Sequence, residues 1–234
     1  AQARVPDVDV RPVLIHGQTL RQDQIPALEE LGILPSLFPM HTFYWGDWHR
    51  DSVLGPQRAE NISPTGWVRE RGLRFTTHHD APVALPDSMR VLDTTVNRTT
   101  RSGRVLGENQ KVDVMTALKA MTLWSARQHF EEDSKGSIEV GKLADFVVLS
   151  DNPLTVPTTR LIDLHVEETI KEGETIFRRE ARTSDAAPPA LGLAPALAGH
   201  RHDHGQHGDG QYGGDGCFAP GLEVIFHTLT GTQH

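Results

Sequence analysis

The 234-residue chain has a single cysteine, which excludes a disulfide framework within the chain and a cysteine-based zinc site. Long hydrophobic runs are also missing. The longest lies near residues 146–149 and is far too short for a transmembrane helix. Basic residues are outnumbered by acidic ones, 23 against 31, and the formal net charge is −8. This sign argues against nucleic acid or an anionic membrane as the main partner. Because the first 15 residues show no signal-peptide pattern and cysteine is scarce, we favour a cytoplasmic location.

Short apolar runs alternate with helical spacings in the first half of the chain, and Gly32 and Gly72 each end a helical stretch. This alternation is typical of βα units that build a parallel sheet. The fold class predicted for residues 1–130 is therefore α/β. The predicted strands are residues 12–16, 33–38 and 73–77, and the predicted helices are residues 24–31 and 61–71.

The first region ends with a helix predicted over 112–129, with Asp113 as a candidate cap. Two further regions follow. Residues 131–181 are rich in strand patterns, at 136–138, 144–149, 166–170 and 175–177. Residues 171–174 are expected to form the turn of a hairpin. Residues 182–234 change character, and the stretch 199–216 holds seven glycines, four histidines and three aspartates. We expect this His/Gly-rich tail to be disordered, because such a composition cannot build a core.

Polar side chains stand at the ends of the predicted strands: His16, His41 and the run His78-His79-Asp80. In a parallel β/α barrel this is the face that carries active sites, and imidazole and carboxylate groups are good ligands for a divalent metal. Each group also has a structural interpretation. A histidine at a strand end often only forms hydrogen bonds, Asp80 before Ala81-Pro82 can be a turn former, and Trp45 can pack in a core. We interpret residues 43–48 as a loop that binds substrate.

Taken together in this order, five segments make the chain resemble the C-terminal part of a YtcJ-like metal-dependent amidohydrolase of the amidohydrolase superfamily. The resemblance covers roughly residues 10–181. It implies the C-terminal portion of a (β/α)8 TIM-type barrel, about strands 6–8, with part of a small composite β-sandwich. The five segments are His16-Gly17-Gln18, Phe38-Pro39-Met40-His41-Thr42, Trp45-Gly46-Asp47-Trp48, His78-His79-Asp80-Ala81-Pro82 and Gly141-Lys142-Leu143-Ala144-Asp145-Phe146.

The resemblance also implies roles for single residues. His16 matches a metal ligand, and Asp80 matches a residue that contacts metal and acts as the catalytic proton shuttle. His41, Trp45 and His78 match positions that line the substrate pocket. The implied cofactor is a divalent metal, with zinc favoured, and the implied reaction is hydrolysis of an amide-like carbon–nitrogen bond in a small molecule.

The family pattern includes further ligands, among them a His-x-His pair on the first barrel strand, whose place would be upstream of residue 1. We therefore expect this chain to be an incomplete part of the enzyme. The first alternative is a non-catalytic remnant, and the second is a split subunit that needs an N-terminal half as its partner. For either, the expected protein partner is that N-terminal half or another copy of the chain in a homo-oligomer. A third alternative is weak metal binding by the tail, through residues such as His200, His202, His204 and His207.

Deletion of residues 199–216 separates the last alternative from the others. If the tail is the metal-binding element, the deletion abolishes metal uptake. If the strand-end residues bind the metal, uptake is unchanged. Metal content after dialysis against zinc, measured by atomic emission, distinguishes the two outcomes.

Overall fold

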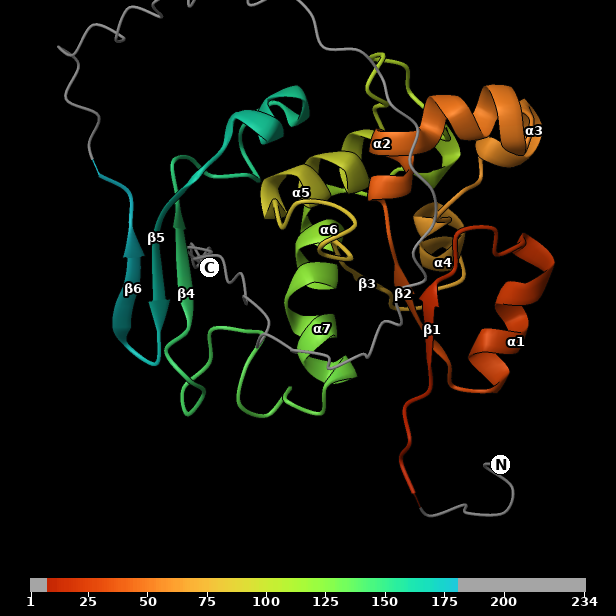
Figure 1. The fold of residues 1–234 in the computed structure, drawn as a ribbon. Helices are drawn as coiled ribbons and strands as arrows, with labels where there is room; N and C mark the ends of the chain where they lie inside the picture. Colours follow the sequence, from red (N-terminus) through yellow and green to blue (C-terminus); the bar gives the residue numbers. More distant parts are fainter. Residues whose placement is uncertain (1–7, 181–234) are drawn as a thin grey trace, which may run out of the picture. The chain divides into compact units, whose positions relative to one another are not determined.

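Three parallel strands form the first sheet of the computed structural model, which describes residues 8–180. The strands are β1 (Val13–His16), β2 (Leu34–Leu37) and β3 (Thr76–Thr77), in the order β1-β2-β3 (Figure 1). His16 pairs with Leu37, and Leu37 pairs with Thr77. The carboxyl ends of the strands therefore lie at one edge of the sheet, as predicted from the βα pattern.

Helical segments connect these strands. η2 (Gln22–Gln24) and α1 (Ile25–Glu30) follow β1, and α1 buries Ile25 and Leu28, the apolar positions of the predicted helix. The connection from β2 to β3 is longer and ends with α4 (Thr65–Glu70), within the predicted helix 61–71. Its other elements are α2 (Met40–Trp48), η3 (His49–Val53), which is a π-helix, and α3 (Pro56–Ala59).

The prediction of a loop over residues 43–48 is wrong, because these residues belong to α2. Apolar and aromatic side chains lie all round this helix. It therefore lacks the separate polar and apolar faces that give an amphipathic helix its sequence pattern. Gly46 is tolerated inside the helix for a packing reason, since a Cβ there would lie 2.9 Å from Thr100 Cγ2 and 3.0 Å from Leu106 Cδ2.

After β3 the chain forms α5 (Ser88–Asn97), η4 (Glu108–Gln110), α6 (Val114–Met121) and α7 (Leu123–Gln128). The side chain of Asp113 accepts a hydrogen bond from Thr116 N, which confirms it as the cap of α6. The single helix predicted over 112–129 is interrupted at Thr122, whose φ of −125° and ψ of −88° are not helical.

A second sheet, antiparallel, consists of β4 (Phe146–Leu149), β5 (Val166–Lys171) and β6 (Glu174–Arg178), in that order (Figure 1). The hairpin predicted between the last two strands is confirmed, with left-handed residues at Glu172 and Gly173. The strand predicted over 136–138 is absent. Gly136 has a φ of +85° there, and Ser137 forms a local hydrogen bond with Glu139, so the segment turns instead.

Two apolar clusters account for most of the buried core. One contains Leu37 and Phe75 and joins the parallel sheet to its helices, with Ile25, Leu28, Val68 and Trp124 among its members. The other joins α5 and α6 to η5 (Thr158–Asp163), through buried residues that include Leu92, Ala117, Leu118, Leu161 and Leu164.

Within residues 8–180, no helix combines the length and the apolar character needed to cross a lipid bilayer. The predicted tail, 182–234, lies outside the described residues, as do its histidines and Cys217.

Asp145 of the Gly-Lys-Leu-Ala-Asp segment is buried, and its carboxylate accepts a hydrogen bond from Glu172 N at 2.8 Å. Gly173 N donates to the neighbouring Ala144 carbonyl. Asp145 therefore ties the start of β4, which begins at the next residue, to the hairpin turn. We predict that Asp145→Ala lowers the free energy of unfolding by about 1–3 kcal/mol, because the hydrogen bond from Glu172 N to the charged carboxylate is lost.

Urea unfolding followed by circular dichroism measures this change. Asp133→Ala is the matched control, because Asp133 is exposed. Equal stabilities of the two variants would contradict the role given to Asp145.

Candidate metal centre

Three potential metal ligands converge at the carboxyl edge of the parallel sheet: His16, His78 and Asp80. One donor atom from each residue lies within 4.8 Å of the donor atoms of the other two. His16 is the last residue of β1, His78 directly follows β3, and Asp80 lies two residues further on. The two strands are separated only by β2, so the parallel register brings residues 64 positions apart into contact. His16 Nε2 lies 3.0 Å from Asp80 Oδ2.

Two of the candidate ligands have an unusual backbone conformation. His16 and Asp80 both adopt left-handed conformations, with φ of +64° and +57°. Such values are uncommon for residues other than glycine and persist only when surrounding contacts enforce them. His78 N donates a hydrogen bond to the Leu37 carbonyl at 3.2 Å, which fixes the segment after β3 against the end of β2.

The donor set fits a divalent cation. Two imidazoles and one carboxylate are ligands that zinc and similar ions accept. His78 Nε2 is buried and has no hydrogen-bond partner within residues 8–180. A buried nitrogen of this kind requires a partner, and a bound cation would supply one. His16 and Asp80 are 40% and 35% exposed, so the site is open on one side.

Two of the histidines here are uncharged at neutral pH. Burial lowers the pKa of His78 to about 4, and the neighbouring His16 contributes to this decrease. Burial likewise lowers the pKa of His41 to about 4, again with a contribution from His16. A neutral imidazole keeps a lone pair for a metal or for a hydrogen bond.

His41 and Trp45 lie beside this cluster, on α2. The ring centroids of His41 and His16 are 5.9 Å apart, and those of His41 and Trp45 are 6.2 Å apart. Trp45 also packs partly against the buried cluster of Phe38, Met40, Ala84 and Val91. The structure therefore brings all five predicted site residues to one region, although Trp45 shares its contacts with the core.

Gln18 and His49 were not predicted as site residues. Gln18 Nε2 lies 2.8 Å from His49 Nε2, and His49 Nδ1 is buried without a hydrogen-bond partner in the described part of the chain. His41, Trp45 and His49 are spaced four residues apart, which places them on one face of a helix. That spacing is a usable signal only once residues 40–48 are assigned to a helix.

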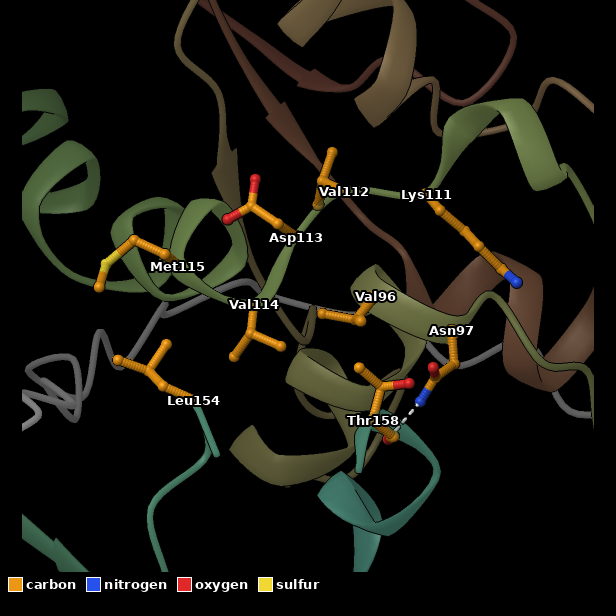
Figure 2. A pocket seen from close by; sticks show the side chains of 9 residues that line it. All are labelled: Val96, Asn97, Lys111, Val112, Asp113, Val114, Met115, Leu154 and Thr158. Carbon is orange, nitrogen blue, oxygen red and sulfur yellow. Dashed lines mark hydrogen bonds between the residues drawn. The ribbon is translucent and has the colours of Figure 1, made fainter. Parts of the chain in front are cut away.

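A surface pocket of about 490 Å³ lies elsewhere, between α5, the start of α6 and the segment around η5 (Figure 2). None of the predicted site residues lines it. Three of its polar side chains already have partners: Asn97 donates to the Thr158 carbonyl, Lys111 pairs with Glu108, and Asp113 caps α6. We therefore place the chemistry at the metal-ligand cluster and not in this pocket.

Two imidazoles and a carboxylate at the carboxyl ends of parallel strands define an α/β protein with a candidate metal centre. The chain belongs to the amidohydrolase family, whose sequence model matches residues 1–177. It is 27% identical over 169 residues to YtcJ of Bacillus subtilis (strain 168), covering 71% of this chain and 32% of that protein. It is 28% identical over 171 residues to the N-substituted formamide deformylase of Arthrobacter pascens, covering 71% and 31%. The chain thus spans about a third of the length of these curated relatives.

Solved structures show the same fold. A metal-dependent hydrolase from Pyrococcus horikoshii OT3 matches with a TM-score of 0.54 and 24% identity, covering 64% of this chain and 30% of that one. An adenosine deaminase from Xanthomonas campestris, solved with bound zinc, matches with a TM-score of 0.50 and 21% identity, covering 74% and 39%. The likeness to amidohydrolase-type enzymes agrees with the mixed α/β architecture.

His78 and His79 offer a matched test of the metal centre, because they are adjacent and only His78 belongs to the cluster. We predict that His78→Ala weakens zinc binding by at least tenfold, since one of three ligands is lost, whereas His79→Ala leaves the affinity within about twofold. Competition with a chromophoric chelator gives both affinities. Equal losses in the two variants would rule out a specific role for His78.

Proposed function

We propose that this chain is part of a metal-dependent hydrolase that cleaves an amide-like carbon–nitrogen bond in a small molecule. The observation that carries the proposal is the convergence of His16, His78 and Asp80 at the carboxyl edge of a parallel sheet. Membership of the amidohydrolase family supports the reaction class. In this proposal β1, β2 and β3 are about strands 6–8 of a (β/α)8 barrel, and β4, β5 and β6 are part of a composite β-sandwich.

The proposed division of the chain follows from this assignment. Residues 1–130 would belong to the barrel and 131–181 to the sandwich. β1 is an edge strand in the described sheet, and its Ile15 is 52% exposed. We propose that this edge pairs with a strand outside the described residues, supplied by an N-terminal half or by another copy, because an apolar open edge favours pairing.

Zinc is the cofactor we propose, held by His16, His78 and Asp80. When bound, zinc would polarise the substrate carbonyl and lower the pKa of a water molecule. The structure supports this choice through the ligand types and through the buried, unpartnered nitrogen of His78. Imidazole nitrogen with a carboxylate oxygen is a combination that zinc uses in catalytic sites.

Asp80 is the proposed proton shuttle. Its carboxylate is 35% exposed and lies against His16 Nε2, so it faces both solvent and the ligand cluster. From this position a carboxylate oxygen can accept the proton of the attacking water and later deliver it to the departing nitrogen. His16 Nε2 lies 3.0 Å from this carboxylate, so Asp80 stands directly beside the other proposed ligands.

His41 and Trp45 are the proposed substrate contacts. The neutral imidazole of His41 can exchange a hydrogen bond with a polar group of the substrate, and the indole of Trp45 supplies apolar surface beside it. Trp48, on the same helix, is 57% exposed. The substrate we propose therefore carries an apolar or aromatic part next to its amide-like bond, as an N-substituted formamide does.

Replacement of Asp80 by asparagine tests the reaction. We predict that Asp80→Asn lowers kcat for an N-aryl or N-benzyl formamide by about 10²–10⁴-fold, because the amide side chain cannot accept the proton. The assay follows amine release by the complete protein at saturating zinc. Asp133→Asn, a surface change, serves as the control. Hydrolysis by Asp80→Asn near the wild-type rate would overturn this role.

A further inference from the structure

Arg98 is fully buried at the C-terminal end of α5. Its guanidinium donates three hydrogen bonds, and all three acceptors are backbone carbonyls: Leu106 at 2.8 Å, Ser63 at 3.1 Å and Ile62 at 2.7 Å. Burial lowers the pKa of Arg98 to about 10, which still leaves it charged at neutral pH. A charge held this way is costly unless each donor is satisfied, so the position calls for an explanation beyond packing.

Ser63 connects this arginine to the metal centre. It is also fully buried and adopts a left-handed conformation with a φ of +47°. Its N–H donates to the Gln18 carbonyl at 2.9 Å, and its Oγ donates to the Phe38 carbonyl at 3.0 Å. Gln18 lies two residues after the ligand His16. Ser63 therefore bridges the chain segments that leave β1 and β2.

Phe38, which Ser63 contacts, also lies next to the candidate ligand His78. Phe38 follows Leu37, the last residue of β2, and the Leu37 carbonyl accepts the hydrogen bond from His78 N. The rings of Phe38 and His78 are stacked, with centroids 5.2 Å apart and an interplanar angle of 16°. A shift of Phe38 would therefore be transmitted to His78 through both the backbone and the ring.

Gly107 packs tightly between Glu60 and the side chain of Arg98. Its N–H donates to the Glu60 carboxylate at 2.5 Å, and its φ is +84°. A Cβ at this position would lie 2.2 Å from the Glu60 carbonyl and 3.1 Å from two guanidinium nitrogens of Arg98. Two irregular segments, around residues 60–63 and 98–107, thus hold each other through bonds between a side chain of one and the backbone of the other.

We propose that Arg98 is a positioning residue for the metal centre: by ordering Ile62 and Ser63 it fixes the separation of the β1 and β2 ends, and with it the placement of His16 relative to His78 and Asp80. The inference rests on the proposed metal-binding function. It adds a residue that touches neither metal nor substrate and acts through Ser63. A purely structural arginine would change stability and leave the ligand geometry intact.

Three variants of the complete protein test this role: Arg98→Lys, Arg98→Met and Ser63→Ala. Ser63→Ala removes only the hydrogen bond from Oγ to the Phe38 carbonyl. The left-handed backbone conformation at this position costs a similar free energy for alanine and for serine, because both have a Cβ. Leu161→Ala is the control, since Leu161 is fully buried in the cluster of α5, α6 and η5 and is expected to lower the melting temperature without touching the Ser63 bridge.

The first readout needs no metal. In ¹H–¹⁵N spectra of the imidazoles, we expect the His16 and His78 signals to move in Arg98→Lys and Ser63→Ala and to stay in place in Leu161→Ala. The second readout is zinc affinity by chelator competition. We expect losses of about 10–100-fold in Arg98→Met, smaller losses in Arg98→Lys, and no loss in Leu161→Ala. The visible spectrum of the Co²⁺ form should change in the same order.

Unchanged imidazole signals and unchanged zinc affinity in folded Arg98→Lys and Ser63→Ala would overturn the inference, as would equal effects in Leu161→Ala. The proposed function fails separately: a wild-type protein that binds no zinc would refute it, while shifted His16 and His78 signals would still support the positioning role of Arg98.

Discussion

Parallel pairing of β1, β2 and β3 is the constraint on which the rest of the site depends. Parallel strands end at the same edge, so residues that follow different strands become neighbours whatever their separation in sequence. The register that pairs His16 with Leu37 and Leu37 with Thr77 sets the level of each strand end. A shift of one residue in either pairing would turn the ligand side chains away from one another.

Much of this edge could be predicted from sequence because short apolar runs ended in polar residues. That pattern identified His16 and Asp80 as candidates and predicted that they lie at the same edge of the sheet. It also placed His78 near the site but did not identify it as a third member of the cluster. The left-handed conformation of Asp80 lies beyond the end of β3 and leaves no strand pattern in the sequence, so the pairing of His78 with Asp80 could not be predicted.

Other parts could not be predicted, for identifiable physical reasons. α2 has no polar face, so its sequence lacks helical periodicity. The break at Thr122 leaves apolar spacing intact on both sides and is invisible to a pattern search. The contacts of Arg98 join residues that are 35 and 36 positions apart through backbone carbonyls, which every residue possesses. No side-chain pattern can signal a partner of that kind.

The π-helix η3 has a consequence for the path of the chain after α2, which it extends. A π-turn holds one more residue than an α-turn, and here the bond from Leu54 N to the His49 carbonyl closes such a turn. A homologue shorter by one residue within 49–53 would restore regular winding. The point at which the chain leaves the helix, just before Gly55 with its φ of +74°, would then move by about 100° around the helix axis relative to His41 and Trp45. The length of this short stretch, more than its composition, would then decide the direction in which the chain continues from η3 to α3.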